Sequence, residues 1–528
     1  EIDPAWKRWS LFTLPMLPRS FPLVVIPETK AQFAVVKRVL SDRAVTRIVC
    51  ATDAGREGEL IFRYIYEAAG CRKPVSRLWI SSLTRDAILD GFARLRRGAE
   101  YDSLADAARG RSRADWLVGM NLSRAYSLVL DQDISVGRVQ TPTLAILVER
   151  ELAIRDFVPE DYREVVARFE PVTGAAKGGA SYLGTWFRPP APGVTDDEPS
   201  KRRRLPADGV EAAAIAARAR VGRAEIASIE ATTRSIPPPQ LYDLTELQRH
   251  ANRLYGMSAQ KTLDVAQSLY ERHKLISYPR TDSRHLSASV AATLPDVVAA
   301  VGGRYPGLLA PGTGARPLGR RFVDDARVTD HHAILPTARS AEASALNSFE
   351  QKIYDLICRR LLAAWHEDHV YASTTVVTTV TSADAPAIVD AYESRGTAVQ
   401  RVGWKVLEVG HDKPAAKPRG KAGAARGEAE GGDQALPAGL VRGQAQRVLE
   451  ANVVDKQTRP PPRHTEATLL GAMETAGKTL EEKELSDAMR DLGLGTPATR
   501  AQIIETLLRR EYVIRDGKSL VATDKGIH

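Results

Sequence analysis

The sequence has few cysteines, no long apolar run and no nucleotide-binding loop. Its three cysteines, Cys50, Cys71 and Cys358, are too scattered for a CxxC zinc ribbon and too few for a disulfide framework, which indicates a reducing, intracellular setting. No apolar run reaches the length of a membrane span and no secretory signal opens the chain, so we expect a soluble cytoplasmic protein without a membrane partner. The absence of GxxxxGK[ST] argues against nucleotide hydrolysis at a phosphate loop.

The chain is long and positively charged. Its 528 residues are enough for roughly three or four domains, and its hydrophobic fraction of 43% is ordinary for a globular protein. The net charge of +9 suits a polyanionic partner, although many basic proteins bind no nucleic acid.

The segment from His273 to Leu286 has the pattern most typical of a chemical site. Tyr278 precedes Pro279, which favours an extended backbone, and Arg280 is then expected on the same side of the chain as the phenol. A free phenol has a pKa of about 10, so a nearby guanidinium would favour phenolate and also bind a phosphate. The pair predicts a nucleophile beside a phosphate clamp. The alternative is a half-buried strand tyrosine and a surface arginine.

Two carboxylates, Asp53 and Glu57, follow a predicted buried strand at residues 47–51 and precede a helical pattern at residues 60–66. The carboxyl end of a strand is where a doubly wound sheet places its ligand. Carboxylate oxygens suit Mg²⁺, which keeps waters that phosphate oxygens can replace. The alternative is helix capping by Glu57 and a structural turn at Asp53.

Basic residues also mark two possible nucleic-acid contacts. Residues 84–130 have helical patterns, in which a helix expected to start at Arg111 places Arg113, Trp116 and Arg124 near one face. Two phosphate contacts flanking an aromatic ring would suit single-stranded nucleic acid. A core tryptophan with solvated arginines is the simpler alternative.

The loop Ser135–Gln140 contains a glycine and leads into a helix, which is a natural anion site to which Arg138 adds a guanidinium. We expect Thr141 at the N-cap and Pro142 at the first helical position. The buried stripe of this helix is predicted to be Leu144, Val148 and Leu152. An ordinary loop-helix junction is the alternative.

Strands and helices alternate in blocks along the rest of the chain. Strand patterns lie at residues 162–169, 181–187 and 370–380. A β domain split by the insertion 237–363 is the simplest organisation, with a solvated loop at Lys201–Arg204. Residues 411–438 have too little apolar content to pack and are expected to be disordered.

Helical patterns cover the remaining segments. Residues 30–40 form one, two packed helices are expected before Tyr278 as in a winged-helix module, and another begins after Thr465. Farther on, His331 or His332 could donate a hydrogen bond to a phosphate oxygen, although a lone surface histidine is the usual alternative.

Five stretches, in this order along nearly the whole chain, resemble the motifs of type IA DNA topoisomerases, and most closely those of the bacterial topoisomerase III branch. They are Ala51–Glu59, Ser135–Gln140, Tyr278–Ser283, Asp330–Thr337 and Gly493–Arg500. The resemblance implies that Tyr278 is the nucleophile, assisted by Arg280, His331 and Glu57, and that Mg²⁺ is held by Asp53 and Glu57. Together with the spacing of the basic residues, it implies DNA contacts at Arg113, Trp116, Arg124, Ser135, Val136, Gly137, Arg138, Val139, Gln140 and Thr496.

The resemblance also implies a multidomain α/β and β fold, in which a partial Toprim α/β domain, winged-helix-like helical domains and a β arch enclose a toroidal hole. The expected domains are a partial Toprim domain at 1–90, a helical gate-base domain at 91–160 and 456–528, a β arch at 161–236 and 364–455 with the disordered insertion 411–438, and a winged-helix-like domain with the tyrosine at 237–363. A decatenation loop would fall near Gly477–Arg490.

The implied activity is ATP-independent cleavage of single-stranded DNA through a 5′-phosphotyrosine, followed by strand passage and religation. Such an enzyme relaxes negatively supercoiled DNA and decatenates DNA in the nucleoid. It would act as a monomer, and a helicase or a single-strand-binding protein could be its partner.

Two departures from the family pattern bear on this expectation. Gly55 stands where the family's Asp-x-Asp-x-Glu motif has its middle aspartate, so we expect a weaker metal site or one completed by another residue. The glutamate and lysine of the first Toprim strand have no counterpart, and we expect a fragment that cleaves inefficiently. The alternatives are a catalytically impaired remnant that binds single-stranded DNA, and a Toprim nuclease that hydrolyses DNA without forming a covalent adduct.

Overall fold

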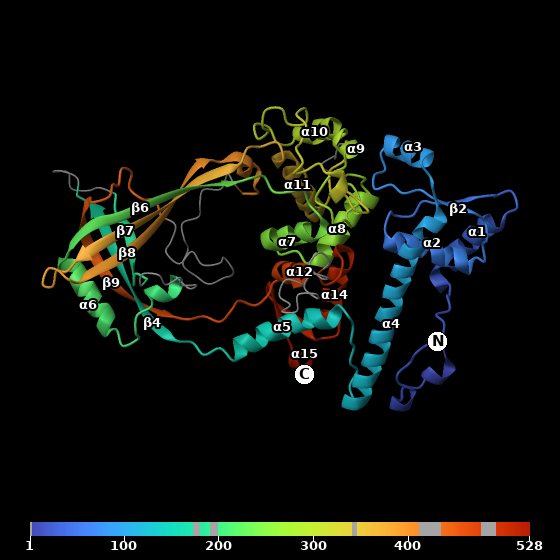
Figure 1. Cartoon of the computed structure of the whole chain (residues 1–528), viewed down its shortest axis with the longest axis horizontal. Coiled ribbons are helices and arrows are strands. Elements are labelled where there is room, and N and C mark those ends of the chain that lie inside the picture. Colours follow the sequence, from blue (N-terminus) through green and yellow to red (C-terminus); the bar gives the residue numbers. More distant parts are fainter. Residues whose placement is uncertain (1–2, 173–179, 191–198, 340–345, 411–433, 477–492) are drawn as a thin grey trace. The chain divides into compact units, whose positions relative to one another are not determined.

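The computed structural model describes residues 3–172, 180–190, 199–339, 346–410, 434–476 and 493–528. The chain forms two compact units. The first unit combines Glu1–Glu151, Pro239–Trp365 and Arg463–His528, and the second combines Leu152–Pro238 and His366–Pro462. Helices and sheets together make the mixed α/β fold that the sequence predicted (Figure 1). In the described part of the chain, no helix is long and apolar enough to cross a membrane.

The first unit is mainly helical. Its helices are α1 (Lys30–Ser41), α2 (Arg56–Ala68), α3 (Arg85–Ala93), α4 (Asp102–Leu130), α5 (Gln140–Arg155), α7 (Leu244–Tyr255), α8 (Ala259–Glu271), α9 (Ala288–Ala291), α10 (Leu294–Gly302), α11 (Ser348–Ala363), α12 (Glu466–Thr475), α14 (Pro497–Arg509) and α15 (Asp524–Ile527). Its strands are β1 (Ile48–Cys50), β2 (Val75–Arg77), β3 (Arg96–Arg97), β10 (Val513–Asp516) and β11 (Ser519–Ala522). The helices and the strand predicted within residues 30–66 are confirmed as α1, β1 and α2.

A small three-stranded sheet positions the acidic turn. Strand β1 pairs in parallel with β2, and β2 pairs antiparallel with β3. Helix α2 connects the two parallel strands and packs against α4. The turn that contains Asp53 and Gly55 lies between the end of β1 and the start of α2. The predicted location at the carboxyl end of a strand is therefore confirmed.

Two local predictions about α4 and α5 are wrong. Helix α4 begins at Asp102 and not near Arg111. Helix α5 already begins at Gln140, so Thr141 is not its N-cap and Pro142 is not its first residue. The hydroxyl of Thr141 instead accepts a hydrogen bond from the backbone of Gly137.

The buried face of α5 is also shifted by one residue. It consists of Thr143, Leu147 and Glu151, whereas Leu152 is exposed. Leu147 packs into a core formed with α8, α12, α14 and the hairpin of β10 and β11. Glu151 can be buried because both its carboxylate oxygens accept from the guanidinium of Arg463, at 2.9 and 3.0 Å. The sequence supplied the helical period, but it did not show which of two adjacent stripes faces inward.

Helix caps define the carboxyl-terminal segment as expected. Thr465 caps α12 by accepting a hydrogen bond from the backbone of Thr468, and Thr496 occupies the N-cap of α14 directly before Pro497. The segment Gly477–Arg490, predicted as a decatenation loop, lies outside the described residues.

The second unit is a closed antiparallel barrel with the strand order β4-β5-β8-β7-β6-β9 (Figure 1). Its elements are β4 (Asp161–Pro171), β5 (Tyr182–Phe187), α6 (Val210–Val221), β6 (Arg223–Ile236), β7 (His369–Thr381), β8 (Val389–Arg401) and β9 (Ala445–Gln457). Alternate side chains of β4, including Phe169, fill the interior together with Ile215 of α6. The three predicted strand segments are confirmed as β4, β5 and β7.

Two segments of the second unit are more ordered than predicted. In the supposed solvated loop Lys201–Arg204, the largely buried Arg203 forms an ion pair with Glu393. Residues 411–433 of the predicted disordered insertion lie outside the described residues, but Gln434 hydrogen-bonds to both backbone groups of Leu183 and Leu436 packs on the barrel core. Pairing with strand β5 explains the order at this end.

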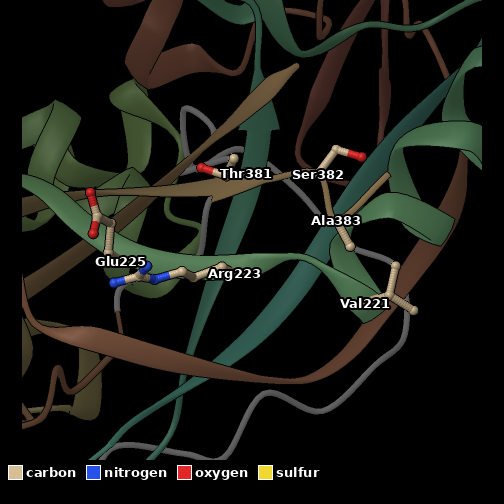
Figure 2. A pocket seen from close by; sticks show the side chains of 6 residues that line it. All are labelled: Val221, Arg223, Glu225, Thr381, Ser382 and Ala383. Atoms are coloured by element: carbon tan, nitrogen blue, oxygen red, sulfur yellow. The ribbon is translucent and has the colours of Figure 1, made fainter. Parts of the chain in front are cut away.

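A pocket of about 430 Å³ lies where β6 begins and β7 ends. It is lined by Val221, Arg223, Glu225, Thr381, Ser382 and Ala383 (Figure 2). None of the predicted site residues contributes to this pocket, so we do not assign the chemistry to it.

Two histidines, the buried His464 and the partly buried His250, predict how stability depends on pH. Burial, aided by the positive charge of Arg360, lowers the pKa of His250 to about 4, and burial lowers the pKa of His464 to about 4. The unfolded chain has histidine pKa values near 6.5, so it takes up these protons first, and folding stability falls as the pH drops from about 6.5 to 4. The expected loss is on the order of 3 kcal/mol for each histidine.

Urea unfolding at pH 7 and pH 4 measures this effect. The stability difference between wild type and His250→Gln should shrink at pH 4, because the variant lacks that proton uptake. Replacement of the exposed His528 by glutamine is the control and should leave the pH dependence unchanged. An equal pH dependence in wild type and His250→Gln would contradict the assignment.

Candidate active site

Tyr278 lies in a loop that is hydrogen-bonded to the segment containing His331. The backbone N–H of Ser277 donates to the carbonyl of Leu335 at 2.8 Å, and the Ser277 hydroxyl accepts from the backbone of Leu335 at 2.9 Å. The described residues around Tyr278 form no regular strand, and the one bridge next to it joins Ile276 to Pro336. The pairing with a distant segment, rather than a regular strand, holds the tyrosine.

His331 is the direct neighbour of Tyr278. The two ring centroids are 4.4 Å apart, and Tyr270 of α8 contacts the phenol ring edge to face, with centroids 5.4 Å apart. The hydroxyl of Thr281 donates to the backbone carbonyl of His331 at 3.0 Å. These contacts connect two of the sequence motifs at the residues proposed to act.

The acidic turn reaches the same place. Nε2 of His331 lies 3.6 Å from Oδ2 of Asp53, and the interaction with His331 lowers the pKa of that carboxyl against the opposing effect of burial. Asp53, His331 and Tyr278 come from widely separated parts of the sequence. The first unit therefore brings a carboxylate, an imidazole and a phenol into one site.

The phenol of Tyr278 is not activated by its surroundings as predicted. Burial and the negative charge of Asp53 raise its pKa above the usual value, and the opposing effect of Arg280 does not compensate. Arg280 donates from Nη2 to Oε1 of Gln267 at 2.9 Å. Arg280 does favour phenolate, as predicted, but burial and the negative charge of Asp53, which was not foreseen as a neighbour, outweigh its effect.

A buried arginine that sequence reasoning missed holds the acidic turn. Arg77, at the end of β2, is 1% exposed, and its guanidinium donates to the carbonyl oxygens of Thr52 at 2.7 Å and Asp53 at 2.6 Å. Its Nε also donates to Glu59 at 3.0 Å, so it fixes both ends of the turn. Nothing in the sequence around Arg77 distinguishes it from the exposed arginines nearby.

Glu57 lies in the first turn of α2, where the helix dipole favours a negative charge. Its carboxylate lies 3.3 Å from Nη1 of Arg111, and the side chains of Glu57 and Asp53 are 64% and 60% exposed. Gly58 allows the helix to approach the turn, because a Cβ there would lie 2.3 Å from the carbonyl oxygen of Asp53. Both predicted metal ligands therefore border the same turn.

The chemistry of these donors suits Mg²⁺, but they are not gathered around one point. Among the described residues, no three histidine, cysteine, aspartate or glutamate side chains are arranged to hold a metal ion together. Asp330 is a further carboxyl next to this turn, and the sequence singled it out only as part of a motif. Burial and the charges of Asp282, Glu57 and Asp53 raise its pKa to about 6.

The predicted DNA-contact residues on α4 are partly covered. Trp116 packs against Trp6 and edge to face against Phe21, with ring centroids 6.2 and 5.5 Å apart. Arg124 is 9% exposed and donates to the carbonyl of Trp6 at 2.6 Å, whereas Arg113 is exposed beside Phe21. Trp116 and Arg124 both line a cavity of about 380 Å³ with these amino-terminal residues. As it stands, Arg124 is not presented to a phosphate.

The backbone N–H groups at the start of the loop Ser135–Gln140 form hydrogen bonds to nearby side chains. The N–H groups of Ser135, Val136 and Gly137 donate to the hydroxyls of Tyr512, Ser123 and Thr141. These three N–H groups are therefore not free to bind an anion, although an anion site was predicted at this loop.

The exposed Arg138 extends from this loop and pairs with Asp115 at 2.9 Å. Val139 lies against Gly495, which places the loop beside the N-cap of α14 at Thr496. Gln140 begins α5. Two of the sequence motifs thus meet here, and Arg138 is the cation they present.

Comparison with known proteins identifies a family that matches this chain. The model of a family described as DNA topoisomerase matches residues 99–528. DNA topoisomerase 3 of Shouchella clausii is 40% identical over 519 residues, covering 97% of this chain and 65% of that protein. DNA topoisomerase 3 of Bacillus subtilis is 38% identical over 526 residues, covering 99% of this chain and 67% of the relative. The chain thus spans about two thirds of the length of these curated relatives.

A solved structure shares the fold at lower identity. Full-length topoisomerase I from Thermotoga maritima matches with a TM-score of 0.63 and 22% sequence identity, covering 95% of this chain and 72% of that one.

Proposed function

This chain belongs to the type IA DNA topoisomerase family, and we propose that it cleaves and religates single-stranded DNA without ATP through a transient bond to Tyr278. The observation that supports this most directly is the convergence of Tyr278, His331 and Asp53 from separate segments of the first unit. The nuclease and remnant alternatives do not require a tyrosine at that point.

In the proposed reaction, the phenolic oxygen of Tyr278 attacks a backbone phosphorus and the bond to the 3′ oxygen breaks. The products are a 5′-phosphotyrosine and a 3′ hydroxyl, which receives a proton as the phenol loses one. Because one phosphodiester replaces another, the reverse attack religates the strand without a nucleotide. Nε2 of His331 would donate to a phosphate oxygen, and Arg280 would stabilise the added negative charge.

Asp53 and Glu57 would hold Mg²⁺ at the acidic turn. When bound, Mg²⁺ would bind phosphate oxygens and neutralise their charge. The side chains present are suitable in type, since both are carboxylates exposed at the acidic turn. Each is now paired with a cationic or polar side chain that a metal ion would replace.

The finer fold assignment is also part of this proposal. Residues 1–90 would form the partial Toprim domain, 91–160 and 456–528 the gate base, 237–363 the tyrosine domain, and 161–236 with 364–455 the β arch. Hinge motion of the arch would open a toroidal hole for strand passage. The substrates would be negatively supercoiled or catenated DNA with single-stranded regions, which a helicase or a single-strand-binding protein could expose.

End-labelled single-stranded DNA tests the proposal. After incubation with Mg²⁺ and denaturation, DNA labelled at its 3′ end should migrate with the protein, because the 5′ phosphate of that fragment is bonded to tyrosine. DNA labelled at its 5′ end should give a shorter free strand. Free fragments from both labels would indicate a nuclease, and intact DNA would indicate a binding remnant. Either result would overturn the proposal.

A further inference from the structure

The backbone conformation at position 55 does not require a glycine. It lies in the acidic turn at the N-cap of α2, with φ −152° and ψ 178°, which is extended backbone that any residue can adopt. Its backbone makes ordinary bonds, donating to the carbonyl of Asp53 and accepting from the N–H of Glu59. The backbone therefore leaves position 55 open to other residues.

What excludes a side chain at position 55 is the carboxyl group of Asp330. A Cβ at Gly55 would lie 2.0 Å from Oδ2, 2.4 Å from Cγ and 2.6 Å from Oδ1 of Asp330, which is far inside contact distance. A carboxyl group from another motif thus occupies the space in which a side chain of residue 55 would begin. The same turn contains Asp53 and Glu57.

We propose that Asp330 supplies the third carboxylate of the Mg²⁺ site, in place of the one that position 55 lacks. This inference rests on the metal site of the proposed function and adds a ligand to it. The three carboxylates would provide hard oxygen donors from both sides of the turn, and full coordination would be completed by waters and phosphate oxygens. Because Asp330 directly precedes His331, the metal and the active-site imidazole would then share one short segment.

The side chains can reach such an arrangement by rotation. Asp53 is turned towards His331 and Glu57 towards Arg111, which is why the described carboxylates do not now converge. Both side chains are more than half exposed, and ion pairs at exposed positions contribute only about 0–1 kcal/mol. A divalent cation would therefore draw both carboxylates away from these partners at low cost.

Calorimetric titration of the whole chain with Mg²⁺ tests the inference. Asp330→Asn keeps the shape of the side chain and should weaken Mg²⁺ binding by about tenfold or more. The double variant Gly55→Asp with Asp330→Gly returns a carboxylate to the same space from the other side, and should restore affinity to within about threefold. Unfolding in EDTA should show that Asp330→Asn remains folded, because it removes charge repulsion and no packing.

Asp282→Asn is the matched control. Asp282 interacts electrostatically with Asp330 and accepts a hydrogen bond from Thr329, but it does not occupy the space at Gly55. If Asp330 acts only by its charge, both variants should weaken binding equally, and this result would overturn the inference. Wild-type affinity in Asp330→Asn, no rescue by the double variant, or no Mg²⁺ binding by the wild-type chain would also overturn it.

The outcome is separable from that of the proposed function. A wild-type chain that forms the labelled adduct while Asp330→Asn binds Mg²⁺ normally refutes only the role of Asp330. A wild-type chain that binds Mg²⁺ through Asp330 but forms no adduct refutes the cleavage reaction and leaves the ligand assignment standing.

Discussion

Replacement of Tyr278 by phenylalanine should abolish the covalent adduct with single-stranded DNA, with a loss of at least about a thousandfold in the cleavage rate. The variant lacks the only oxygen that the proposal uses to bond to phosphorus. The ring itself is retained, and so are its contacts with Tyr270 and His331, so folding should be unchanged. The measurement is adduct formation from 3′-labelled DNA after denaturation.

Tyr270→Phe is the matched control for this experiment. Tyr270 contacts the Tyr278 ring edge to face and lies on α8, but it is not assigned a chemical role. Its variant should cleave within a few-fold of wild type, and both variants should bind single-stranded DNA. An undiminished adduct in Tyr278→Phe, or equal losses in the two variants, would refute the nucleophile.

His331→Ala should slow cleavage by about 10²–10⁴-fold, the range expected for loss of one proton-donating side chain in a transition state. The His331 ring lies 4.4 Å from the Tyr278 ring, measured between centroids, and its Nε2 lies 3.6 Å from Oδ2 of Asp53, so a phosphate held at the phenol would lie beside the imidazole. Single-turnover adduct formation measures the rate, and fluorescence anisotropy with labelled DNA measures binding. The rate should fall much more than the affinity.

Substitution of the adjacent His332 shows whether the role of His331 is chemical or structural. It is partly buried, its Nδ1 lies 2.8 Å from the carbonyl of Ala333, and burial lowers its pKa. His332→Asn should therefore affect stability more than the cleavage rate. A larger rate loss in His332→Asn than in His331→Ala, at equal folding, would reverse the assignment of the two histidines.

Local sequence features predicted the elements that carry the site, because those features act over a few residues. Helical periodicity located α1 and α2, and the strand patterns located β1, β4 and β7. The same reasoning failed where a neighbour decides the outcome. It misplaced the start of α4, and it chose Leu152 over Glu151 because it could not include the partner Arg463.

The sequence by itself determined which kinds of chemistry the chain can perform, since a tyrosine beside an arginine and a pair of carboxylates at a strand end are local patterns. Only the tertiary structure decided which of these groups meet. It set Asp53 against His331, raised rather than lowered the pKa of Tyr278, and placed Asp330 in the space at Gly55. The physical reason is that charge, burial and steric exclusion act through space. They depend on contacts between residues that are far apart in the sequence, and the sequence alone does not show which of these residues meet.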